Sequence, residues 1–174
     1  MPTPQPDPWL RGPVPGVAPW LQPSAHALVQ AREDIRRFAD GLDAQALWAK
    51  PGGAASIGFH LFHMASALDR LLAYARGEAL SAEQQKDLAR EREGLQGSLT
   101  AEELIHRVER TIDRALEQFR RTPEADLLTE RKVGKAGHPS NVLGLLAHGA
   151  EHAFRHAGQI ATTAKLVARG RGEG

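Results

Sequence analysis

The sequence predicts an all-α protein, a four-helix bundle that follows a proline-rich N-terminal arm. Four long stretches carry apolar residues at intervals of three and four, the period of a helix with one buried face. No stretch alternates apolar and polar residues convincingly, as a half-buried strand would. Eight of the eleven prolines fall within residues 1–23, where they prevent a continuous helix. We therefore expect an arm at residues 1–22 and one bundle domain at residues 23–170.

Length, charge and cysteine content exclude several classes of protein. The chain of 174 residues has the size of one domain, and its 22 lysines and arginines nearly balance 21 acidic residues. Such a balance gives no net field that attracts nucleic acid or an anionic membrane. The absence of cysteine excludes thiolate catalysis, thiolate metal ligands and disulfides. With no secretory signal and no apolar run of about 18 residues, we expect a soluble, cytoplasmic protein.

The arm carries apolar residues as well as prolines. Trp9 and Trp20 lie within it, together with aliphatic side chains. Burying apolar surface is favourable by about 25 cal/mol per Å². Proline also restricts the unfolded chain, which reduces the entropy lost on docking. We therefore expect the arm to pack along the body or across a subunit interface.

The four predicted helices begin and end at ordinary capping signals. They span residues 23–42, 56–77, 100–122 and 139–168. The signals are Ser56 and Gly77 for the second helix, Thr100 with Glu103 for the third, and Pro139, Ser140 and Gly170 for the last. Residues 43–53 should form a short turn of helix that ends at Pro51, Gly52 and Gly53, and two further segments should be connections.

Both of these connections are long. Residues 81–94 are highly charged, which favours a solvated connection or a frayed helix, and no chemistry is assigned to them. Residues 123–139 contain glycines and prolines and form the kind of loop that often lies over a site.

Five of the eight histidines fall in two of the predicted helices. His152 and His156 are one turn apart on the last helix, so their rings can converge on one ion. His148 and His156 are separated by roughly 12 Å along the helix axis and by about 80° around it, which makes sharing an ion difficult. The converging pair is therefore His152 with His156, or His148 with His152.

The second helix offers a third imidazole from His60 or His63. Bundles commonly build metal sites between facing helices. Three nitrogen ligands leave a coordination position for water or substrate, an arrangement typical of a catalytic metal site. Since the chain has no cysteine, any metal must take nitrogen or oxygen ligands.

At these histidines the chain resembles the DinB-like (YfiT-like) metalloprotein superfamily. The resemblance rests on "SIGFHLFH" at residues 56–63 and on "EHAFRHAGQI" at residues 151–160, and it covers most of the chain from about residue 24 onward. It implies a four-helix bundle with a three-histidine metal site. By position it implies His63, His152 and His156 as ligands, which decides against His148. Ala55 stands where that family often has tryptophan, so His60 remains the reserve candidate.

The resemblance also implies a range of functions. Members of the superfamily act as thiol-dependent transferases or isomerases with bacillithiol, mycothiol or glutathione, and others are regarded as metal-dependent hydrolases. It therefore implies a divalent metal ion, such as Zn, Ni or Fe(II), a small-molecule substrate that includes a low-molecular-weight thiol, and a homodimer. The alternative is a non-catalytic metal-binding or scaffold protein that keeps the bundle. The balanced charge argues against nucleic acid as a partner.

Overall fold

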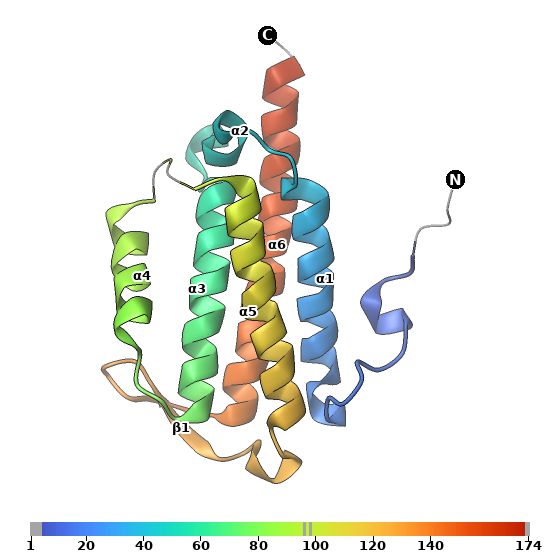
Figure 1. The fold of residues 1–174 in the computed structure, drawn as a ribbon, viewed down its shortest axis with the longest axis vertical. Helices are drawn as coiled ribbons and strands as arrows, with labels where there is room; N and C mark the ends of the chain where they lie inside the picture. The colour runs from blue at the N-terminus through green and yellow to red at the C-terminus, as the bar shows by residue number, and fades with distance from the viewer. Residues whose placement is uncertain (1–4, 96, 98, 173–174) are drawn as a thin grey trace.

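Four long helices lie side by side in the structure, a computed structural model that describes residues 5–95, 97 and 99–172 (Figure 1). They are α1 (Gln22–Ala39), α3 (Ile57–Arg76), α5 (Ala101–Arg121) and α6 (Val142–Gly172). Helices α1 and α3 each pack against both α5 and α6, so the four enclose one core. The predicted all-α bundle is confirmed.

Shorter elements connect the bundle helices. They are α2 (Ala44–Trp48), α4 (Ala82–Glu93), β1 (Glu130–Val133), β2 (His138–Asn141) and the 3₁₀ turns η1 (Pro8–Leu10), η2 (Pro19–Leu21), η3 (Pro51–Gly53) and η4 (Glu124–Asp126). Helix α4 stands outside the bundle, beside α3 (Figure 1).

Helix α3 is fixed at both ends by the residues that the sequence indicated. The Ser56 side chain accepts a hydrogen bond from the backbone N–H of Phe59 at 3.2 Å, which caps the first turn. Gly77 ends the helix at φ +79°, a left-handed conformation that favours glycine. Leu61, Met64 and Leu68 are buried along its length. These features place His60 and His63 in the first two turns of a helix that cannot slide along its axis.

A short hairpin occupies the segment that was expected to be a plain connection. Strands β1 and β2 pair antiparallel from Glu130 opposite Asn141 to Val133 opposite His138. These four-residue strands have mostly polar side chains, so no apolar alternation marks them in the sequence. Pro139 and Ser140 lie in β2 rather than in the last helix. That helix begins at Val142, where Asn141 Oδ1 accepts from the Gly144 N–H at 2.7 Å.

Of the two alternatives for this segment, a solvated connection or a frayed helix, the structure shows a helix, α4, at residues 82–93. Ser81 and Gln84 make a reciprocal capping box at its start. The sequence left the two alternatives open because it shows no clear apolar face here, and α4 turns polar side chains toward the body. Asp87 is the residue of this helix that is buried most completely, at 8% exposed.

The described part of the arm lies along α1. Arg11 forms a two-pronged ion pair with Glu33 of α1, and Val17 and Leu21 are buried. Trp9 and Trp20, however, are 64% and 69% exposed, so in a single chain their rings do not supply the buried area expected of them. Residues 1–4 of the arm lie outside the described residues. No helix in the described part of the chain is long and apolar enough to cross a membrane.

Candidate metal centre

Three histidine side chains converge between α3 and α6. His63 comes from α3 and His152 and His156 from α6, and one ligand atom of each lies within 4.8 Å of the others. The ring centroids are 5.0 Å apart for His63 and His152, and 4.4 Å apart for His152 and His156. The structure thus brings together the three residues that the resemblance implied as ligands.

The spacing of the two α6 rings suits a tetrahedral ion. Nε2 of His156 lies 3.3 Å from Nε2 of His152. Two imidazole nitrogens bound to zinc at about 2.0–2.1 Å in tetrahedral geometry would be separated by about 3.3–3.4 Å. The i, i+4 spacing on one helix therefore produces a distance close to that of a shared metal ion.

Glu91 of α4 contacts the ring of His63, the histidine that α3 contributes to the cluster. Its Oε2 lies 2.8 Å from Nδ1 of His63, and Arg70 of α3 binds both carboxylate oxygens at 2.8 and 3.2 Å. Burial by itself would raise the pKa of Glu91, but the hydrogen bonds from His63 and Arg70 outweigh it and lower that pKa. Glu91 is therefore ionised at neutral pH and can only accept a proton. Nδ1 of His63 must then carry its hydrogen, which leaves Nε2 with the free lone pair that a metal ion needs.

His60 lies outside the three-ring cluster but touches it. The residue is buried, and its Nδ1 is 3.1 Å from Nδ1 of His156. This contact uses the nitrogen of His156 that faces away from His152. His60 therefore holds the His156 ring in place, a role that the sequence analysis did not distinguish from that of a ligand.

His148 does not belong to the cluster. Its side chain is 53% exposed and its Nδ1 lies 3.1 Å from a carboxylate oxygen of Glu151, on the outer face of α6. The rotation of α6 thus directs the converging pair to His152 and His156.

The environment keeps two of the rings neutral. Burial lowers the pKa of His152 to about 4, and His63, whenever it is protonated, and Arg155 lower that pKa further by charge repulsion. Burial also lowers the pKa of His156 to about 3, with further repulsion from His152 and His63. Nδ1 of His152 is buried without a hydrogen-bond partner among the described residues. Neutral imidazole is the form that binds metal, so these side chains fit a divalent ion.

Sequence reasoning missed Glu91 and Arg70. One signal pointed to the helix that carries Glu91, since Ser81 and Gln84 have the spacing of a capping box. No signal in the sequence pairs Glu91 with His63, because the contact joins two helices through a polar face.

Comparisons with known proteins agree with this geometry. A family model described as DinB superfamily matches residues 27–160, which is most of the chain. The crystal structure of the conserved protein of locus from Enterococcus faecalis is similar, with a TM-score of 0.62 and 17% sequence identity. The match covers 85% of this chain and 96% of that chain, and at this identity it establishes the fold alone. No curated protein matches the chain.

Proposed function

This chain belongs to the DinB superfamily, and from that premise we propose that it is a metal-dependent enzyme whose divalent ion is held by His63, His152 and His156. The observation that carries the proposal is the convergence of three imidazole side chains, with one ligand atom of each within 4.8 Å of the others. Three protein ligands leave a position for substrate, as in catalytic zinc sites. Zinc, nickel and iron(II) all accept imidazole nitrogen, so each is a candidate.

The proposed reaction is transfer to or from a low-molecular-weight thiol, or hydrolysis. A divalent ion in such a site lowers the pKa of a bound thiol or water and so supplies a nucleophile near neutral pH. The chain's own residues prepare the site for this chemistry. Glu91 fixes the proton of His63 on Nδ1, and His60 holds the ring of His156 from the opposite side.

One observation favours the alternative, a metal-binding protein without turnover. Glu91 is the carboxylate that contacts the histidine cluster, and Arg70 and His63 occupy both of its oxygens. A carboxylate that is bound in this way is not free to act as a general base.

The test is metal analysis of the purified protein and of single histidine variants. We expect about one divalent ion per chain in the wild type, and loss of stoichiometric binding in His152→Ala and His156→Ala with the helical circular dichroism signal retained. His106→Ala is the matched control, because His106 is an exposed histidine on α5 outside the cluster. Full occupancy in both cluster variants would refute the site.

A second assay separates the enzyme from the binding protein. The metal-loaded chain is incubated with an electrophile and with bacillithiol, mycothiol or glutathione, and separately with ester and amide substrates. Turnover that disappears in His152→Ala supports the enzyme. Stoichiometric metal without turnover in any of these reactions favours the non-catalytic alternative.

A further inference from the structure

Helix α4 faces the bundle with polar side chains spaced like the apolar residues of an ordinary helix. Gln84, Asp87 and Glu91 stand at positions i, i+3 and i+7, which lie on one face. No residue of α4, all twelve of which are described, belongs to the hydrophobic core. Docking of this helix therefore relies mainly on ion pairs, hydrogen bonds and a cation–π contact.

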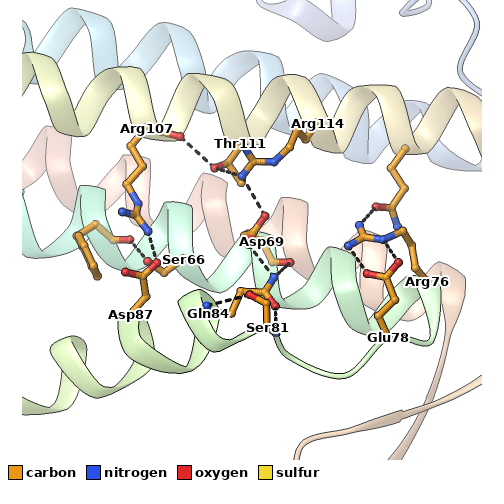
Figure 2. Close-up of polar contacts among 12 residues, drawn as sticks. Ser66, Asp69, Arg76, Glu78, Ser81, Gln84, Asp87, Arg107, Thr111 and Arg114 are labelled. Atoms are coloured by element: carbon orange, nitrogen blue, oxygen red, sulfur yellow. Dashed lines mark hydrogen bonds and ion pairs between the residues drawn. The ribbon is translucent and has the colours of Figure 1, made fainter.

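Each turn of this face makes one contact with the bundle. Gln84 Nε2 donates to Asp69 Oδ2 of α3 at 2.7 Å, and Asp87 forms an ion pair with Arg107 of α5 (Figure 2). The last contact is that of Glu91 with His63 and Arg70. Beneath these contacts, the ring of the buried Phe62 is covered by two guanidinium groups, those of Arg90 at 5.2 Å and Arg107 at 4.6 Å.

The interface between α4 and the bundle is hollow as well as polar. A cavity of about 440 Å³ lies between α3, α4 and α5, and Asp69, Gln84, Asp87 and Arg107 line it. Segments with few apolar contacts open more easily than the core. We therefore expect α4 to detach more easily than any of the four bundle helices.

We propose that α4 is an ion-paired latch whose docking and metal binding at the histidine cluster stabilise each other. The inference rests on the proposed function, since it takes His63 as a ligand. Docking carries Glu91 to Nδ1 of His63, which leaves Nε2 as the free nitrogen of a ring that lies beside His152 and His156. A bound ion in turn holds the His63 ring where Glu91 can reach it. Because coupling between two binding events is reciprocal, each must strengthen the other by the same factor.

The experiment measures amide hydrogen exchange of residues 82–93 together with zinc affinity, using the full chain with and without zinc. Zinc should slow exchange in α4 of the wild type. Glu91→Gln removes the charge that binds Arg70, so it should speed exchange in α4 and weaken zinc binding by about 10-fold to 100-fold. Asp87→Asn removes the ion pair with Arg107 one turn away without touching His63. It should speed exchange in α4 and weaken zinc binding by a smaller factor, about 2-fold to 10-fold.

The matched control is Glu109→Gln, which removes another two-pronged carboxylate–arginine pair, that with Arg36, between α5 and α1. It should leave both the exchange of α4 and the zinc affinity unchanged. Two results would overturn the latch while the proposed function stands. One is zinc binding that leaves the exchange of α4 unchanged. The other is an Asp87→Asn variant whose α4 exchanges faster but whose zinc affinity equals that of the wild type. A wild-type chain that binds no zinc, nickel or iron(II) would overturn both.

Discussion

Nδ1 of His60 lies 3.1 Å from Nδ1 of His156, which joins the first turn of α3 to the middle of α6. Both rings are largely buried, at 7% and 9% exposed. The contact occupies the side of His156 away from His152, so it orients the ring instead of competing for the ion. The same contact explains why His60 and His63, three residues apart, take different roles.

The first prediction separates these two histidines. His63→Ala should abolish stoichiometric zinc binding, because it removes a proposed ligand. His60→Ala should keep one zinc per chain but weaken binding by about 10-fold, because it removes the contact that orients the proposed ligand His156. Calorimetric titration of the two variants decides between them. A metal-loaded crystal structure with His60 on the ion would contradict this assignment.

The second prediction concerns pH and the metal-free protein. His152 and His156 have lowered pKa values when folded, about 4 and about 3, against about 6.5 when unfolded. Between pH 6.5 and pH 4 the unfolded chain therefore binds more protons, so the free energy of unfolding falls as the pH falls. Each ring contributes a slope of up to about 1.4 kcal/mol per pH unit in this window.

Urea unfolding at several values between pH 7 and pH 5 measures this slope. The range from pH 7 to pH 5 is chosen because most carboxylates remain ionised there. The double variant His152→Gln, His156→Gln should show a clearly flatter dependence than the wild type. Equal slopes for the two proteins would show that these rings are not the source.

The third prediction concerns the arm. Deleting residues 1–20 removes the Arg11–Glu33 ion pair and the buried Val17. We expect a loss of about 1–2 kcal/mol, which lowers the melting temperature by several degrees in a chain of this size. Zinc affinity should not change, because no proposed ligand lies in the arm. Differential scanning calorimetry and zinc titration of the truncated chain check both statements.

The exposed Trp9 and Trp20 rings allow a control within the arm. Trp9→Ala with Trp20→Ala should cost a single chain little, because both rings are already mostly in solvent. We predict that they instead contribute to a homodimer, so the double variant should shift sedimentation toward the monomer. An association state identical to that of the wild type would contradict that role.

The fourth prediction uses two glycines in bundle helices. A Cβ atom added at Gly58 of α3 would lie 2.8 Å from the ring of Trp48, which is itself held by a hydrogen bond to the Leu99 carbonyl. Gly58→Ala should therefore destabilise the protein by about 1–3 kcal/mol and displace the turn that carries His60. At Gly158 of α6 a Cβ would meet nothing within 4 Å. Gly158→Ala should instead stabilise by about 0.5–1 kcal/mol, as measured by chemical unfolding.

Much of the fold could be predicted because its signals are local. The apolar period of each bundle helix, the Ser56 cap and the Gly77 terminator all lie within a few residues of the feature they specify. The hairpin gave no such signal, because its paired residues are mostly polar and its two strands pair through their backbones. Helix α4 was left open between a solvated connection and a frayed helix for a related reason, since its inward face is polar.

The sequence by itself determined the four bundle helices, the i, i+4 spacing of His152 and His156, and the absence of thiolate ligands, and its family resemblance implied His63 as the third ligand. Only the tertiary structure decided that His60 contacts His156, and that Glu91 and Arg70 lie beside His63 on the side away from the cluster. The physical reason is that helical period fixes which residues share a face, whereas the rotation and offset of one helix against another fix which faces meet. Rotation and offset come from the packing of the whole core, which joins residues of distant segments such as Leu61 and Leu68 of α3 and Ile160 of α6.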